Sequence, residues 1–80
     1  MVLDPRAATV VQLITLLRET RLAKGLSQEK LAKVAGMSRS GIRHIEDGDV
    51  QPTLYSLLKI ADGLEVELPK VLRKSLRDSK

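Results

Sequence analysis

One stretch, residues 27–48, constrains the fold of this 80-residue chain more than any other. Ala32 is small enough for a second helix to cross close to the first, and Gly36 can take the positive φ that ends a helix and turns the chain sharply. Beyond that glycine, Ile42 and Ile45 lie three residues apart, so they share one face of a second helix. The stretch therefore predicts two short helices joined by a tight turn.

The two predicted helices run over about residues 28–35 and 39–47. Ser27 and Ser38 stand directly before them, and a serine hydroxyl can accept a hydrogen bond from a free backbone N–H of the first helical turn. Two helices that cross steeply around a glycine turn form a helix-turn-helix, whose second helix fits the major groove of DNA. The sequence predicts this motif at about residues 28–47.

The segment before the motif predicts a longer helix. Residues 1–8 are expected to form a frayed arm, although Asp4 and Pro5 could also start a helix as its cap and first-turn residue. The helix would then continue to about Lys24. Its buried stripe, at helical spacing, would be formed by Val10, Leu13, Ile14 and Leu17.

A fourth helix is expected over about residues 54–62 and a fifth over about residues 68–77. Thr53 would cap the fourth helix and Gly63 would end it. The residues expected to face inward from the fourth helix are Leu54, Leu57, Leu58 and Ala61. Five short helices joined by short turns make residues 1–80 a single all-α domain, a compact five-helix orthogonal bundle.

Composition limits the kind of protein this can be. The absence of cysteine excludes disulfides and thiolate sites, and a single tyrosine is the only aromatic residue. The N-terminus lacks the pattern of a signal peptide, and no apolar run approaches the roughly 20 residues that span a membrane. We therefore expect a soluble cytoplasmic protein with no membrane contact. The net charge of +4 fits a nucleic-acid partner.

Several short segments stand at a fixed spacing along most of the chain. They are Gly25-Leu26-Ser27-Gln28, Ser38-Arg39-Ser40, Ile45-Glu46-Asp47-Gly48, Pro52-Thr53-Leu54 and Leu57-Leu58-Lys59-Ile60-Ala61. In these segments the chain resembles the Cro/lambda-repressor-type helix-turn-helix family, also called the xenobiotic-response-element type, over roughly residues 13–68. The resemblance implies a lambda-repressor-like fold and a homodimeric transcriptional regulator that binds a near-palindromic operator in double-stranded DNA. In its small size the chain is similar to restriction–modification controller proteins and to phage repressors.

The exposed face of the second motif helix supplies the candidate base contacts. Arg39 and Ser40 open this helix, and Arg43 and His44 follow one turn later. Arginine can pair with O6 and N7 of guanine. Since the matching positions of family members read bases, the resemblance implies that these four residues contact bases.

The candidate phosphate contacts lie mainly at the helix starts. Gln28 begins the first motif helix, where free N–H groups and the helix dipole favour an anion, and the resemblance supports this role. Ser27 and Ser38 are expected mainly as caps whose hydroxyls can also touch a phosphate. Lys33 and Arg18 are further cationic candidates.

In related proteins an arginine and a glutamate pair across the first and third helices, so the resemblance implies a structural ion pair between Arg21 and Glu46. Two features depart from the pattern of the family. Gly41 lies inside the second motif helix, where glycine weakens a helix or permits a close approach to the duplex. Asp47 and Asp49 stand where relatives often carry Lys or Arg facing phosphate, and we expect these two acids to repel DNA.

Dimerisation is expected to use the C-terminal helix together with the fourth helix, where Tyr55 would be an exposed interface anchor. The other expected interface residues are Leu68, Leu72 and Leu76. A second hypothesis makes the chain an antitoxin-like module that masks a partner toxin and can also regulate its own gene. It depends on three apolar residues beyond the buried stripe of the first helix, whose alternative role is to widen the core: Val11, Leu16 and Leu22.

Neither an enzyme nor a bound cofactor is expected. The chain has one histidine and no cysteine, so His44 has no second ligand of these types with which to build a metal site. It also lacks a glycine-rich phosphate loop and paired carboxylates in a recognisable frame.

Overall fold

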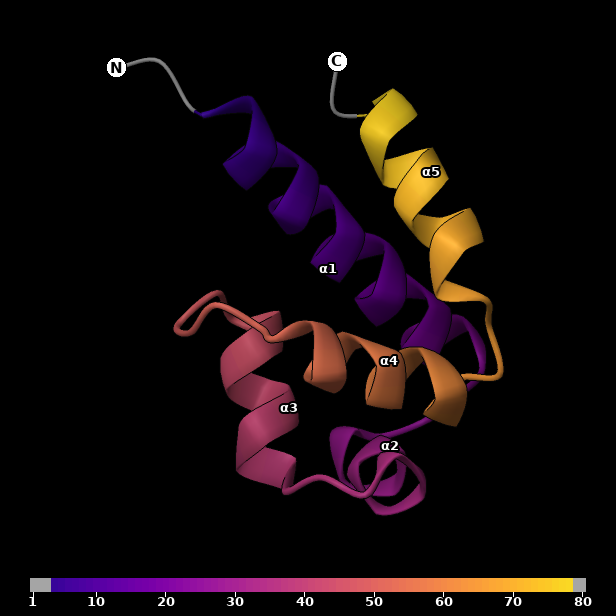
Figure 1. The fold of residues 1–80 in the computed structure, drawn as a ribbon. Coiled ribbons are helices and arrows are strands. Elements are labelled where there is room, and N and C mark those ends of the chain that lie inside the picture. The colour runs from indigo at the N-terminus through magenta and orange to yellow at the C-terminus, as the bar shows by residue number, and fades with distance from the viewer. Residues whose placement is uncertain (1–3, 79–80) are drawn as a thin grey trace.

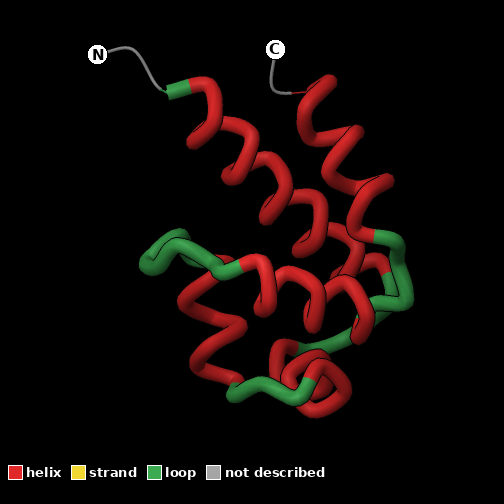
Figure 2. The backbone as a smooth tube through the Cα atoms, in the orientation of Figure 1, coloured by secondary structure: helices red, strands yellow, loops and turns green. Residues whose placement is uncertain are grey.

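The computed structural model describes residues 4–78, and in this part the chain folds into five α-helices (Figure 1). They are α1 (Pro5–Ala23), α2 (Gln28–Ala35), α3 (Arg39–Glu46), α4 (Leu54–Gly63) and α5 (Leu68–Asp78). The described residues contain no strand, so helices and loops make up the whole path of the backbone (Figure 2). The prediction of an all-α five-helix bundle is confirmed, and both motif helices begin at the predicted residues.

Helix α1 begins earlier than the predicted arm allows. Residues 5–8 belong to the first turns of α1, so the prediction of a frayed arm is wrong for them, while residues 1–3 lie outside the described residues. The side chain of Asp4 accepts a hydrogen bond from the backbone N–H of Arg6 at 2.9 Å. Pro5 takes the first helical position, where a missing N–H costs nothing. The alternative start at these two residues is therefore the one that the chain adopts.

Serine hydroxyl groups cap both helices of the motif, α2 and α3, as predicted. Ser27 accepts from the backbone N–H of Lys30 at 3.1 Å, and Ser38 accepts from that of Gly41 at 2.9 Å. A Cβ atom on Gly41 would lie only 3.1 Å from the Ser38 hydroxyl oxygen. Glycine inside the second motif helix therefore leaves room for the hydrogen bond that starts this helix. Thr53 caps α4 in the same manner.

Helices α1 to α4 end in one common geometry. After each last turn a residue takes a positive φ, and two backbone N–H groups reach back to the carbonyl groups three and five residues earlier. The four residues with positive φ are Gly25, Gly36, Gly48 and Glu65. Glycine adopts this conformation without a steric penalty, whereas the Cβ atom of a glutamate is crowded there.

Gly63 is still helical and is the last residue of α4, so it does not stop the helix as predicted; the residue with the positive φ that turns the chain is Glu65. Gly63 instead faces α2. A Cβ atom on it would lie 3.1 Å from Cδ1 of Leu31 and 3.2 Å from Cβ of Ala35. This glycine therefore allows the end of α4 to approach α2 closely.

The core is aliphatic and contains residues of every helix. Its members are Leu13, Leu17, Leu31, Ala32, Ala35, Ile42, Ile45, Ile60, Ala61, Leu64 and Leu68. Leu54 and Leu58 were predicted to face inward from α4 but are 66% and 49% exposed. The buried stripe of α4 instead follows positions 57, 60, 61 and 64, whose spacings are those of a single helix face. Leu54 lies before the start of this stripe, and Leu58 lies beside it.

The arrangement of the helices leaves one of them at the periphery. Helix α5 packs along α1, while α2 packs against both α3 and α4 (Figure 1). Helix α3 lies at the end of the bundle away from α5 (Figure 1). Its inner face is covered by α1 and α2, so its outer face is free to meet another molecule.

Replacing Glu65 by glycine should stabilise the fold, because glycine reaches the φ of 59° found at this residue without crowding a Cβ atom. We expect the free energy of unfolding of Glu65→Gly to exceed that of the wild type by about 0.5–2 kcal/mol, measured by urea denaturation. Glu65→Ala is the matched control, since it removes the same carboxylate but keeps Cβ. An equal gain in both variants would assign the effect to the charge and contradict the backbone explanation.

Candidate nucleic-acid interface

Helix α3 has two chemically different faces. Its inner face carries Ile42 and Ile45, which are 0% and 5% exposed. Its exposed residues include the four predicted base contacts, Arg39, Ser40, Arg43 and His44. The structure therefore presents these four side chains at the surface of one short helix. Their contacts with DNA stay predictions.

The two acids that were expected to repel DNA each lie beside a basic residue of this face. Arg43 Nε is 3.6 Å from Asp47 Oδ2, and His44 Nδ1 is 3.1 Å from Asp49 Oδ2. All four side chains are about half exposed, so solvent screens the pairs and they add little to stability. The prediction from the sequence considered the negative charges of Asp47 and Asp49 but not the basic side chains that lie beside them. The turn at Gly48, with its φ of 78°, brings Asp49 back towards α3.

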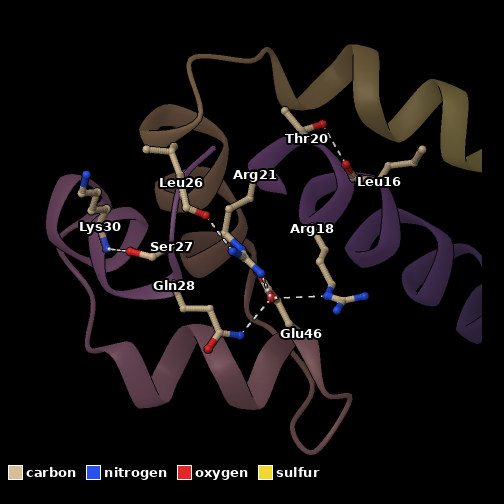
Figure 3. Close-up of polar contacts among 9 residues, drawn as sticks. All are labelled: Leu16, Arg18, Thr20, Arg21, Leu26, Ser27, Gln28, Lys30 and Glu46. Carbon is tan, nitrogen blue, oxygen red and sulfur yellow. Dashed lines mark hydrogen bonds and ion pairs between the residues drawn. The ribbon is translucent and has the colours of Figure 1, made fainter. Parts of the chain in front are cut away.

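A buried ion pair holds α3 against α1. Arg21 Nε and Nη2 donate to the two carboxylate oxygens of Glu46 at 2.7 and 2.9 Å (Figure 3). The pair implied by the family resemblance is therefore present, and each side chain is only 7% exposed. Two parallel N–H···O bonds fix an angle as well as a distance. The last residue of α3 is thus held in one orientation relative to α1.

Further bonds extend this network to α2. Arg21 Nη1 donates to the carbonyl oxygen of Leu26 at 2.7 Å, and Gln28 Nε2 donates to Glu46 Oε1 at 3.0 Å (Figure 3). Arg18 Nε lies 3.7 Å from the same carboxylate oxygen. One carboxylate therefore joins α1 with both helices of the motif.

The surroundings of Glu46 favour its ionised form. Burial raises the pKa of this carboxyl group, but the hydrogen bonds from Arg21 and Gln28 oppose that effect. The positive charges of Arg21 and Arg18 act in the same direction as these bonds. The net result is a pKa below the ordinary value of 4.5.

Four of the predicted phosphate contacts lie on α2 and at the starts of the two motif helices, while the further candidate Arg18 lies on α1 beside Glu46. Ser27 and Ser38 use their hydroxyl oxygens as caps, and Lys33 is exposed in the last turn of α2. Gln28 uses one amide N–H for Glu46, which leaves its second N–H for another acceptor. The contacts of all four residues with phosphate stay predictions.

Helix α4 carries an exposed apolar cluster. It consists of Leu54, Tyr55 and Leu58, whose spacing keeps them on one side of the helix, and Tyr55 is 69% exposed. Lys59 Nζ lies 4.5 Å from the centre of the Tyr55 ring. Sequence reasoning identified the tyrosine but assigned both leucines to the core. The apolar residues at positions 57, 60, 61 and 64 already form a complete buried stripe, and this pattern could have shown that Leu54 and Leu58 are not needed in the core.

The predicted interface residues of α5 do not share one environment. Leu72 and Leu76 are 39% and 50% exposed. Leu68 is only 8% exposed and packs in the core of its own chain, so its assignment to a subunit interface is corrected. It is the first residue of α5 and follows closely after the buried Leu64, which keeps this part of the chain inside the bundle.

The three surplus apolar residues of α1 also differ from one another. Val11 and Leu22 are 60% and 53% exposed, so they do not widen the core. Leu16 is half-buried and lines a groove of about 420 Å³ between α1 and the start of α5, together with Thr20 and Val71.

Other kinds of site are not found in residues 4–78. No helix there combines the length and the apolar composition that crossing a membrane requires. The His, Asp and Glu side chains of this region do not form a group of three that could hold a metal ion.

Removing the carboxylate of Glu46 should destabilise the fold. Glu46→Ala leaves the buried charge of Arg21 without its partner, and breaking such a pair costs about 3–5 kcal/mol. Because folding lowers the pKa of Glu46, its stabilising contribution is present above the ordinary value of 4.5 and is lost as pH falls through the folded-state pKa. Denaturation of the wild type from pH 7 down to about pH 3 should show this loss, and Glu46→Gln should show less of it.

Glu67→Gln is the control for both effects. Glu67 also has a lowered pKa, through its hydrogen bond with Lys70 and the charge of that lysine, but it is exposed. We expect the free energy of unfolding of Glu67→Gln at pH 7 to differ little from that of the wild type. Equal stability of Glu46→Ala and Glu67→Gln would contradict the structural role of the buried pair.

Comparison with known proteins agrees with this arrangement. Residues 17–71 match a family model described as Helix-turn-helix. An uncharacterized HTH-type transcriptional regulator of Sinorhizobium fredii, y4dL, is 37% identical over an alignment of 65 residues that covers 78% of this chain and 33% of that protein. The chain thus spans about a third of the length of this relative.

Two further similar proteins are close to this chain in size. Control protein C.SmaI of Serratia marcescens is 35% identical over 57 residues, which are 71% of this chain and 68% of that protein. The crystal structure of the restriction–modification controller protein C.AhdI of Aeromonas hydrophila has a TM-score of 0.71 and 40% identity, over 78% of this chain and 94% of that one. Since the family model covers more than half of the chain, including both motif helices and the buried ion pair, the chain belongs to the helix-turn-helix family of the Cro/lambda-repressor, or xenobiotic-response-element, type.

Proposed function

We propose that this protein is a sequence-specific transcriptional regulator that binds a near-palindromic operator as a homodimer, in the cytoplasm. One observation carries the proposal: the exposed face of α3 bears Arg39, Arg43 and His44, and the buried bond between Arg21 and Glu46 fixes that face relative to the bundle. Similarity to proteins named as controllers of restriction–modification systems supports the same function.

In the proposed complex α3 enters the major groove and its outer side chains read base edges. Arg39 and Arg43 suit O6 and N7 of guanine. Gln28 and the N–H groups at the start of α2 would meet a phosphate and set the register of the protein on the duplex. A twofold dimer would place two copies of α3 in half-sites about 10–10.5 base pairs apart, or a multiple of that spacing.

The exposed apolar cluster of α4, formed by Leu54, Tyr55 and Leu58, is our candidate for the centre of the dimer interface. An exposed tyrosine beside two leucines has the composition of an interface core. Leu72 and Leu76 of α5 are also exposed and apolar, and they are our second candidate for residues of the interface.

A second candidate function is favoured by a different observation. Val11 and Leu22 of α1 are exposed although they are apolar, and such residues suit a protein partner. In that case the chain would act as an antitoxin-like module that masks a toxin encoded beside it. Co-purification with the product of a neighbouring gene, lost in Val11→Ser and Leu22→Ser, would support this function.

Selection of bound duplexes from a random library tests the principal proposal. The selection should be done at about 150 mM salt, because low salt inflates nonspecific binding to phosphate. Enrichment of a palindrome with a regular half-site spacing supports the proposal. A folded protein that enriches no sequence contradicts it.

Truncating either arginine of the α3 face should weaken specific binding. We expect Arg39→Ala and Arg43→Ala each to lose about 1–3 kcal/mol of binding free energy to the selected operator, measured by fluorescence anisotropy. Arg73→Ala is the matched control, since Arg73 is an exposed arginine of α5, away from α3. Unchanged affinity in correctly folded Arg39 and Arg43 variants would refute their assignment.

Placing a charge in the apolar cluster of α4 should dissociate the dimer. We expect Leu58→Glu to sediment as a monomer at micromolar concentration where the wild type is a dimer, because association would bury an unpaired carboxylate. Leu72→Glu makes the same change on α5. Dissociation by Leu72→Glu alone would move the centre of the interface from α4 to α5, and a monomeric wild type would refute the dimer.

A further inference from the structure

The end of α3 fixes one carboxylate beside the single histidine of the chain. Gly48 takes a φ of 78°, and the backbone N–H groups of Gly48 and Asp49 donate to the carbonyl oxygens of Ile45 and His44 at 3.2 and 2.9 Å. In this type of helix end the residues at the positions of His44 and Asp49 commonly share an apolar contact. Here they share a polar one, with His44 Nδ1 3.1 Å from Asp49 Oδ2.

The chemistry of this contact assigns a proton. An ionised carboxylate can only accept hydrogen bonds, so the hydrogen must lie on Nδ1 of His44. In the neutral ring the other nitrogen, Nε2, then carries a lone pair and is an acceptor. Nε2 is on the far side of the ring from Asp49 and has no hydrogen-bond partner among residues 4–78.

The direction of this outward nitrogen matters for the bases that His44 can read. An Nε2 acceptor complements an amino group in the major groove, on N4 of cytosine or N6 of adenine. A histidine without the carboxylate favours the opposite tautomer in water, with the hydrogen on Nε2. That ring would instead donate to a hydrogen-bond acceptor, which is O6 or N7 of guanine, N7 of adenine or O4 of thymine.

We propose that Asp49 is a positioning residue that determines specificity: it holds His44 in the tautomer whose outward nitrogen accepts, so that His44 selects an exposed amino group of cytosine or adenine. This inference rests on the proposed function, because it needs α3 to lie in the major groove. It also gives the acid beside α3 a part in recognition, although its charge alone opposes the approach of DNA.

The half-exposed setting of the pair supports a role in recognition over one in stability. His44 and Asp49 have side chains that are 47% and 57% exposed, and such pairs contribute little to folding. The neighbouring pair between Arg43 and Asp47 has a similar exposure but a longer separation of 3.6 Å. An arginine has no tautomer to select and remains a donor in either case. Of these two acids, therefore, only Asp49 can decide whether the basic side chain beside it donates or accepts a hydrogen bond.

The first experiment measures the tautomer in the protein without DNA. Because the chain has one histidine, ¹⁵N labelling of histidine gives a long-range ¹H–¹⁵N correlation spectrum from His44 alone. At about pH 8.5, where histidine rings are ordinarily neutral, we expect the hydrogen on Nδ1 in the wild type and mainly on Nε2 in Asp49→Ala, which removes the acceptor. Asp47→Ala is the matched control and should leave the tautomer of His44 unchanged. A wild type with its hydrogen mainly on Nε2 overturns the proposal.

The second experiment measures which bases are selected. Random duplex libraries are bound by the wild type and by Asp49→Ala at the same salt concentration and pH. We expect the preference to change by roughly five- to tenfold at one base pair of each half-site, away from a base that offers His44 an amino group and towards a base that offers it an acceptor. Preferences at the other positions should be retained, and circular dichroism should show an equally folded variant.

The outcomes separate the inference from the function on which it rests. A wild type that selects an operator, with an Asp49→Ala variant that selects the same bases at every position, overturns the role of Asp49 and leaves the regulator function supported. A folded wild type that selects no sequence refutes the proposed function and, with it, the role of Asp49 in specificity. A changed tautomer together with a change at one base pair supports both.

Discussion

The paired hydrogen bonds between Arg21 and Glu46 set the geometry on which the rest of the structure depends. Helix α3 has only eight residues, and a helix of this length is not stable in water by itself. It is held by two isoleucines on its inner face and by a carboxylate in its last turn. Because that carboxylate is fixed to α1 and α2, the direction of the outer face of α3 is set by the bundle and not by the loops beside it.

The ends of the helices make up for a small core. The side chains of the hydrophobic core are aliphatic and of modest size, so the chain has few large contacts from which to gain stability. Hydroxyl or carboxylate caps and left-handed turns satisfy backbone groups that short helices would otherwise leave open. Within the described residues no buried side-chain nitrogen or oxygen lacks a hydrogen-bond partner. The fold is therefore specified largely by local polar bonds around a compact aliphatic centre.

These local signals explain how much of the structure could be predicted from the sequence. Ser27, Gly36 and Ser38 act on their own neighbours, and the two motif helices begin at the residues that they indicate. Apart from the start of α1, the predictions that were wrong concern residues whose position depends on packing between helices. Gly63 is needed for the approach of α4 to α2 and not for a turn, and Leu54 faces outward because the stripe of α4 starts later. The contact of Asp49 with His44 could not be foreseen, because it depends on the geometry of a turn.

The position of Tyr55 has a consequence for spectroscopy. The chain contains no tryptophan or phenylalanine, so this tyrosine is the only side chain that absorbs and emits as an aromatic chromophore in the near ultraviolet. Its ring is 69% exposed on α4 and touches the ammonium end of Lys59 instead of the core. Its emission and near-ultraviolet signals therefore report the solvent around one outer face of the bundle. They are poor probes of unfolding and sensitive probes of whatever comes to cover that face.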